Sequence, residues 1–131
     1  MSRSTRYRNT DLEVTSPSDL QLLADALTAQ GVLQLAVVSG DDGEWHATFE
    51  TETVFSEPET NIVAMLDAIE SLPSPIRAMW NECSKREFNV GYDCGLEPPS
   101  FTQALSESTL GRIAALGATL RLTLYAVELS E

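Results

Sequence analysis

His46 is the only histidine of the chain, and Cys83 and Cys94 are its only cysteines. Imidazole-based acid–base catalysis would have to use His46, and a cysteine nucleophile would need that ring within hydrogen-bond reach. In the segment EWHATFETETVF (44–55), His46 alternates with apolar residues, so a strand here directs the imidazole away from the core. Cys94 is expected to face the core. The sequence therefore predicts an exposed histidine and no catalytic constellation.

Metal ions and cofactors have no recognisable binding motif in the sequence. No histidine or cysteine cluster has the spacing of a zinc site. The segment GDDGE (40–44) groups carboxylates but lacks the alternating oxygen ligands of a calcium loop, and the turn of a β-hairpin accounts for it. There is neither a GxGxxG motif nor a P-loop to hold a phosphate. We therefore expect no metal and no cofactor.

The densest cluster of polar and aromatic residues is KREFNVGYDCG (85–95). Lys85 and Arg86 are expected to end a helix, and Gly91 inside the following strand indicates a bulge or a close backbone approach. Ligand pockets combine apolar walls with a few polar groups, and one set of residues fits that description: Arg77, Trp80, Asn89, Tyr92 and Asp93. The alternative, which the pattern favours, is a bulged strand with a buried tyrosine and no ligand.

Charge is the most informative feature of the composition. The 131 residues include 20 acids and 8 bases, a net charge of −12. Residues 9–76 contain thirteen acids and no Lys or Arg, whereas residues 77–131 are nearly balanced. We expect negative potential concentrated on the N-terminal portion, which disfavours nucleic acids and anionic membranes and attracts a basic protein. The candidate contact residues are Asp41, Asp42, Glu44, Glu50 and Glu52. Plain solubility is the alternative explanation.

Hydrophobic periodicity defines the elements that would position these residues. Alternation predicts strands over 11–16, 32–39, 44–55, 88–95 and 119–128, and helical spacing predicts helices that begin near 16–19, 56–59, 74–75 and 106–108. Gly31 and Gly117 are expected to end the first and last helices. Leu33, Leu35 and Val37 are expected to face the core in the second strand, as are Leu120, Leu122 and Leu124 in the last one.

This order predicts an α+β fold, a two-layer sandwich of about five strands in one sheet with helices mainly on one face, ferredoxin-like or split βαβ. Residues 1–10, with Arg3, Arg6 and Arg8, are expected to form a flexible basic tail, and residues 11–131 a single domain. The chain begins without an apolar signal region and has no apolar run long enough to span a bilayer, so we expect a cytoplasmic protein.

The strings REFNVGYDCG (86–95) and SFTQALSESTLGRIAALGATLRLTLY (100–125) resemble a family of uncharacterised small bacterial single-domain α/β proteins. The closing helix and strand are also similar to those of some immunity-type proteins of bacterial toxin systems. The resemblance implies a protein-binding role and assigns no functional residue.

Two hypotheses follow. The first is a non-catalytic acidic interaction module that binds a basic protein, and the second is a small-ligand-binding regulatory domain with a pocket near Trp80, Tyr92 and Asp93. An open sheet has two edge strands, which makes a homo-oligomer a further expectation.

Overall fold

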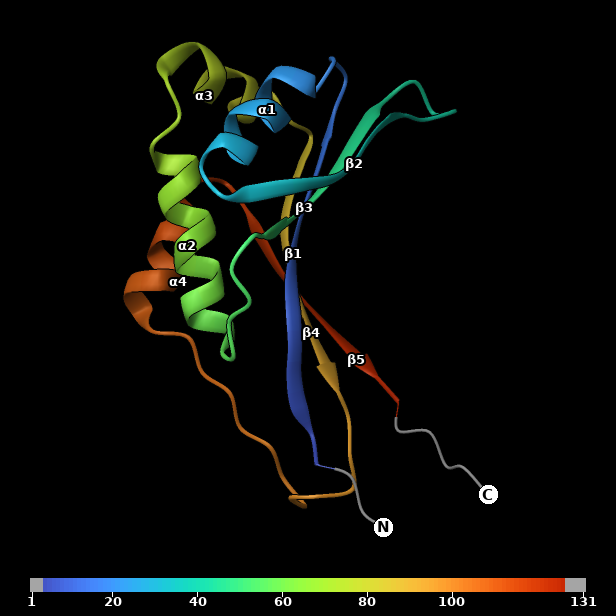
Figure 1. Ribbon diagram of the computed structural model, residues 1–131, viewed down its shortest axis with the longest axis vertical. Helices are drawn as coiled ribbons and strands as arrows, with labels where there is room; N and C mark the ends of the chain where they lie inside the picture. The colour runs from blue at the N-terminus through green and yellow to red at the C-terminus, as the bar shows by residue number, and fades with distance from the viewer. Residues whose placement is uncertain (1–3, 127–131) are drawn as a thin grey trace.

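The computed structural model describes residues 4–126, which form one mixed β-sheet and four helices (Figure 1). In chain order the elements are β1 (Arg6–Ser16), α1 (Gln21–Ala29), β2 (Val32–Ser39), β3 (Trp45–Thr51), α2 (Pro58–Glu70), α3 (Ser74–Asn81), β4 (Lys85–Asp93), α4 (Glu107–Ala115) and β5 (Thr119–Tyr125). This is the order that the sequence predicts. Residues 1–3 of the expected tail and residues 127–128 of the expected last strand lie outside the described residues.

The strands lie side by side in the order β2-β3-β1-β4-β5. Neighbouring strands are antiparallel except β4 and β5, which are parallel and are joined by a long connection that contains α4. The helices pack against one side of the sheet, and the other side is polar (Figure 1). The predicted two-layer α+β sandwich with five strands in one sheet is therefore confirmed, whereas the narrower ferredoxin-like layout stays a prediction.

The core lies between the helices and the central strands. Leu12 of β1, Phe49 of β3 and Phe88 of β4 point to the helix side and are completely buried, as is Leu66 of α2. The period-two alternation of each strand places these side chains on one face, opposite polar neighbours. Burial of one such side chain contributes roughly 1.5–3 kcal/mol. This layer holds the helices on the sheet.

Trp80 connects α3 to the end of α4. Its side chain is fully buried, and the indole Nε1 donates a hydrogen bond to the carbonyl oxygen of Leu116 at 3.0 Å. The next residue, Gly117, has φ +70°, and Gly31 after α1 has φ +88°. Both glycines end their helices in the left-handed conformation, as predicted.

The first strand is longer than expected. Residues 6–10 were expected in a flexible tail, but β1 begins at Arg6, which pairs with Asp93, and Thr10 pairs with Val90 and is 1% exposed. The physical reason is topological. β1 is the central strand of the sheet, and β4 extends along it far enough to pair with this polar segment.

Lys85 and Arg86 begin β4 and do not end a helix, because α3 stops at Asn81. The guanidinium of Arg86 nevertheless reaches back to the C-terminal end of α3. It donates hydrogen bonds to the carbonyl oxygens of Trp80 and Cys83, at 3.0 and 3.1 Å. A positive charge does meet the negative end of the helix, but it comes from the following strand.

The expectation for the second strand is only partly correct. Val37 faces the core side opposite Ala47, whereas Leu35 is 54% exposed. The register of β2 against β3 shifts between Gln34 and Ala36, so Leu35 is an extra residue that the partner strand does not match. A bulge of this kind reverses the alternation, and Leu33 therefore lies opposite Glu50 on the polar side.

Candidate functional site

A cavity of about 500 Å³ lies where the helices leave the sheet uncovered. Its floor is the helix-facing side of β4 and β5, and its outer wall is the segment that leads from β4 to α4, residues 95–105, which we call the strap. In Figure 1 the strap runs below α2 and α4 as a long irregular connection. The cavity is lined by Thr5, Pro58, Val90, Tyr92, Cys94, Gly95, Pro98, Pro99, Phe101, Gln103, Leu105, Leu110, Leu120, Leu122 and Leu124.

The floor follows from two adjacent alternating strands. The parallel register pairs Val90 with Leu122 and Tyr92 with Leu124, so alternate apolar side chains of both strands stand on the same face. Leu122 and Leu124 remain 61% and 66% exposed because α4 ends the covered region above them. Branched side chains left open to solvent over a hollow are a common feature of ligand sites.

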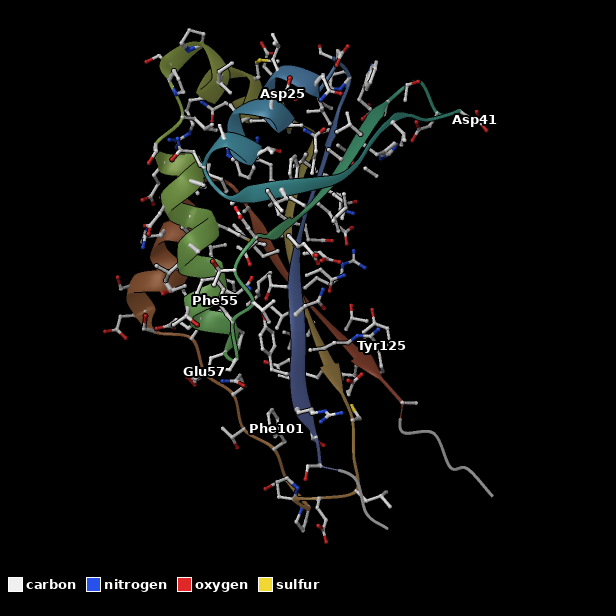
Figure 2. The ribbon with its side chains drawn as sticks, viewed as in Figure 1. Asp25, Asp41, Phe55, Glu57, Phe101 and Tyr125 are labelled. Atoms are coloured by element: carbon white, nitrogen blue, oxygen red, sulfur yellow. The ribbon has the colours of Figure 1, made fainter. Side chains whose placement is uncertain are left out.

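The strap is held against the sheet at several points. The ring of Phe101 contacts the ring of Tyr92 edge-on, with centroids 5.6 Å apart (Figure 2 labels Phe101). The backbone N–H of Thr5 donates to the carbonyl oxygen of Glu97 at 2.8 Å. At the far end the N–H of Ser106 donates to the carboxylate of Glu59 at 2.6 Å. These contacts fix the wall of the cavity on both sides.

The lining carries no ionisable acid or base other than the Tyr92 phenol and the Cys94 thiol. Burial raises the pKa of Tyr92 above its ordinary value, so its hydroxyl stays protonated. Thr5 and Gln103 add neutral polar groups to the lining. A charged ligand would lose hydration here without gaining a counter-charge, so the cavity suits an uncharged molecule.

Of the five residues predicted to form a pocket, only Tyr92 lines this cavity. Trp80 is enclosed in the core, and Arg77 lies half-buried on α3. Asn89 and Asp93 belong to the opposite, polar face of β4, since they alternate with Val90 and Tyr92. The structure therefore does not bring these five residues together, because the strand divides them between its two faces.

Asn89 and Asp93 take part in contacts on the polar face. Asn89 donates from Nδ2 to the Glu13 carboxylate at 3.3 Å and accepts from Thr123 at 2.7 Å. Asp93 forms a 3.4 Å ion pair with Arg8, which also stacks over the ring of Tyr125. Gly91 lies between them and pairs with Asn9 at a register shift whose extra residue, Arg8, belongs to β1 and not to the strand of Gly91. These contacts belong to the pairing of strands.

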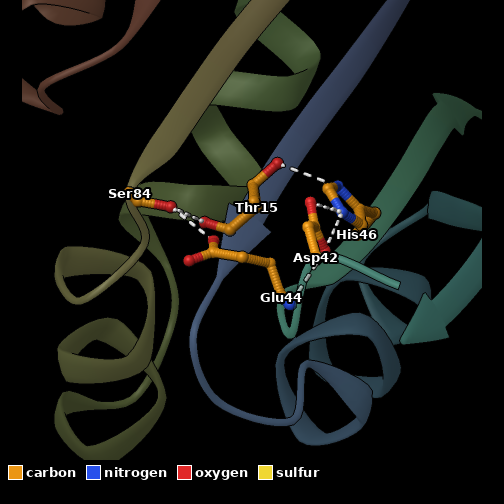
Figure 3. Close-up of polar contacts among 5 residues, drawn as sticks. All are labelled: Thr15, Asp42, Glu44, His46 and Ser84. Carbon is orange, nitrogen blue, oxygen red and sulfur yellow. Dashed lines mark hydrogen bonds and ion pairs between the residues drawn. The ribbon is translucent and has the colours of Figure 1, made fainter. Parts of the chain in front are cut away.

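Asp41 and Asp42 lie exposed in the turn of the β2–β3 hairpin, which extends away from the helices (Figure 2 labels Asp41). The carboxylate of Asp42 accepts from the Glu44 N–H at 2.9 Å and contacts His46 Nε2 at 3.1 Å (Figure 3). The backbone hydrogen bond and the histidine lower the pKa of Asp42. Glu44 accepts a hydrogen bond from Ser84 at 3.0 Å. Three of the predicted contact residues therefore lie together.

The other two predicted contact residues lie apart from the turn. Glu50 is half-buried on the polar face of the sheet, and Glu52 is exposed beyond the end of β3. The polar face also carries cations, including Lys85, which pairs with Glu13 and Glu87 at 3.6 and 3.4 Å. Glu50 therefore lies in a face of mixed charge.

The thirteen acids of residues 9–76 do not form one acidic surface. Asp25, Asp41 and Glu57 lie in three separate parts of the molecule (Figure 2). Asp67 and Glu70 of α2 are paired with Arg112 of α4, at 2.7 and 2.8 Å. The expectation of concentrated negative potential is thus wrong, because segments adjacent in sequence are distributed over both layers of the fold.

His46 lies half-buried on the polar face, where Nδ1 contacts the Thr15 hydroxyl at 3.2 Å. Cys94 lines the cavity on the other side of the sheet, and Cys83 is buried, where desolvation raises its pKa to about 11.

Among residues 4–126 no group of three or more His, Cys, Asp or Glu could hold a metal ion. No helix in this range is long and apolar enough to cross a membrane.

Sequence reasoning missed the strap as part of a site. The segment LEPPSFTQAL (96–105) reads as an irregular crossing, and the structure confirms that it has no helix. The available signal was its composition, because Pro98, Pro99, Phe101 and Leu105 give an irregular segment an apolar inner surface.

Comparison of this chain with protein-family models, with curated proteins and with solved structures found no match. The resemblance of the C-terminal third to small bacterial proteins stays a prediction, and the function is argued from the cavity itself.

Proposed function

We propose that this protein binds an uncharged, predominantly apolar small molecule in the cavity between β4, β5 and the strap. The observation that carries the proposal is the 500 Å³ hollow whose floor exposes Leu122 and Leu124. Ligand sites commonly have volumes of roughly 300–1,000 Å³ and a mainly apolar lining with few polar groups. Of the residues that the sequence-based ligand-binding hypothesis named, the proposal retains only Tyr92. The other residues of the proposed site are those that line the cavity.

The energetic argument concerns the exposed leucines. Each square ångström of apolar surface removed from water contributes about 25 cal/mol to the free energy of binding. A ligand that covers both side chains is therefore favoured. The strap is already fixed by its contacts with Tyr92 and Thr5, and by the hydrogen bond from Ser106, the residue that follows it, to Glu59. This reduces the entropy lost when a ligand binds. The neutral hydroxyl and amide groups of the lining would orient the ligand.

The test uses a neutral apolar fluorophore, N-phenyl-1-naphthylamine, whose emission rises in an apolar site. We expect saturable binding to the unmodified protein that is insensitive to salt, because no ion pair takes part. Leu124→Gln should weaken binding about tenfold or more, since it places an amide on the floor. Leu35→Gln is the matched control, because Leu35 is similarly exposed but lies on β2.

Two results would contradict the proposal. One is the absence of saturable fluorescence with the folded protein. The other is equal weakening by Leu124→Gln and Leu35→Gln, which would indicate nonspecific adsorption to exposed leucines.

A second candidate function is the binding of a basic protein by the β2–β3 hairpin. The supporting observation is that Asp41 and Asp42 are exposed at the end of a hairpin that extends away from the helices (Figure 1). Capture of a basic protein from the source cell at low salt, its loss at high salt, and its loss from the Asp41→Asn, Asp42→Asn double variant would support this function. Recovery of the same proteins by the double variant would refute it.

A further inference from the structure

β5 is an edge strand, because among the described residues it pairs only with β4. The carbonyl oxygen of Tyr125 accepts a hydrogen bond from the N–H of Cys94, so the backbone groups of Tyr125 point toward β4. Backbone groups of successive strand residues point to opposite sides. The N–H and C=O groups of Leu120, Leu122 and Leu124 therefore point to the free edge and are available to another strand.

This edge lacks the features that normally prevent pairing with another chain. Thr119–Tyr125 contains no proline, its register against β4 has no shift, and its one charged residue, Arg121, is held in an ion pair with Glu87 of β4 at 2.8 Å. Protected edges carry prolines, bulges or inward-pointing charges. The opposite edge strand, β2, has such a feature, because its register shifts between Gln34 and Ala36.

Charge also distinguishes the two edges. The protein carries a net charge of −12, so two copies repel each other on average. β2 itself has no charged residue, but the hairpin turn that follows it exposes Asp41 and Asp42. The one charged residue of β5 is Arg121, and Glu87 of β4 neutralises it in a 2.8 Å ion pair. Two copies therefore meet with the least repulsion at β5.

From these observations we infer that the partner of this edge is a second copy of the same chain, paired antiparallel through β5 about a twofold axis at Leu122. The axis places Leu122 opposite Leu122 of the second copy, and Leu120 opposite its Leu124. Arg121 lies opposite Thr123, so no like charges face each other. The residues of the hydrogen-bonded pairs are Leu120, Leu122 and Leu124, whose backbone N–H and C=O groups point to the free edge. Each can therefore exchange two hydrogen bonds with its counterpart, as an antiparallel ladder requires.

The paired strands also account for the exposed leucines. Leu122 and Leu124 are 61% and 66% exposed in the single chain, and the same side chains from the second copy would continue the apolar surface across the axis. Cross-strand neighbours of this kind have Cβ atoms roughly 4.5–5.5 Å apart. The dimer would join the helix-facing sides of two sheets into one extended surface.

Mass measured by sedimentation equilibrium, without ligand, tests the dimer. We expect a dimer of the 14.3 kDa chain that dissociates at least about tenfold more readily in Leu122→Lys, because two ammonium groups then face each other across the axis. Leu35→Lys, the same change on the β2 edge, should leave the mass unchanged. A monomer at every concentration, or equal effects of the two substitutions, would overturn the inference.

Single cysteines test the register in a Cys94→Ser background. Leu122→Cys should form a disulfide-linked dimer with itself, because the axis brings its two copies within bonding distance. Leu120→Cys alone should not crosslink, whereas a mixture of Leu120→Cys and Leu124→Cys should. Crosslinking of Leu120→Cys with itself as fast as Leu122→Cys would overturn the register.

These measurements use no ligand, so they stand apart from the proposed function. Failure of the fluorophore to bind would leave the dimer untouched, and a monomeric protein could still bind the fluorophore.

Discussion

The helix-facing side of the sheet is covered at one end and open at the other. At the closed end, defined by Leu12, Phe49 and Phe88, α1 and α2 bury each strand side chain completely. At the open end, Leu122 and Leu124 face the same side but remain more than half exposed. The two ends have the same alternating pattern of apolar residues. The difference shows that a strand's pattern sets the direction of a side chain, while packed helices decide whether it is buried.

The two ends also differ in what fills the space above them. Trp80 and Leu66 occupy the closed end, whereas the strap covers only one side of the open end and leaves a cavity. Side chains at the closed end should therefore contribute most of the stability of the fold, whereas those at the open end should bind the ligand. The following predictions test that division.

The largest effect is expected from equal truncations at the two ends. Leu66→Ala removes a completely buried side chain and should lower the free energy of unfolding by about 2–5 kcal/mol, measured by urea denaturation. Leu124→Ala removes the same atoms from an exposed site and should cost less than about 0.5 kcal/mol. Similar costs for both would show that the open end is packed in solution.

Two glycines, Gly111 in the middle of α4 and Gly117 just after it, should respond to substitution with opposite signs. Gly117→Ala should cost roughly 1–2 kcal/mol, because φ is +70° and the new Cβ would lie 2.8 Å from Arg86 Nη2. Gly111→Ala meets no atom within 4 Å and should stabilise α4 by about 0.5–1 kcal/mol. Thermal melting distinguishes them, and a stabilised Gly117→Ala would contradict the left-handed cap.

The two thiols should differ in reactivity. Cys83 is buried and its pKa is raised to about 11, whereas Cys94 lines the cavity at the open end. N-ethylmaleimide should modify Cys94 at least about tenfold faster than Cys83, since the thiolate is the reactive form. The single variants Cys83→Ser and Cys94→Ser assign the rates by mass spectrometry. Saturating N-phenyl-1-naphthylamine should slow modification of Cys94 alone, and an unchanged rate would place the probe elsewhere.

The smallest effect concerns the polar face. Burial, followed by the nearby charges of Glu50 and Glu13, raises the pKa of Asp11 above its ordinary value of 3.8. Because the fold favours the protonated form, this carboxyl costs stability as the pH rises through that range and remains unfavourable at neutral pH. Asp11→Asn should therefore stabilise the protein at pH 7 by roughly 0.2–1 kcal/mol and have little effect below pH 3.8. A destabilised variant at pH 7 would show that the attraction between Asp11 and Arg8 outweighs the cost of burial and the repulsion from Glu50 and Glu13.

Much of the architecture could be predicted because its signals are local. Alternation over residues 44–55 correctly directed His46 to the face opposite the buried Ala47 and Phe49, and Gly31 and Gly117 end the first and last helices as expected. Where the prediction was wrong, the cause was a neighbour distant in sequence. Pairing with β4 extended β1 to Arg6, and the bulge against β3 exposed Leu35.

The candidate site was less accessible to sequence reasoning. Tyr92 was identified, but the residues grouped with it lie in the core or on the opposite face. The cavity is formed by the strap, β5 and α4, which are separate segments of the chain. Hydrophobic periodicity describes each segment by itself and does not indicate which segments meet.

The sequence by itself determined the order of the elements, the faces of most strands and the glycines that end the helices, because dihedral preferences and side-chain alternation act over a few residues. Only the tertiary structure decided the strand order, the scattering of the acids and the cavity at the open end. These depend on which segments meet in space and on where each helix ends above the sheet, and burial is a property of that arrangement.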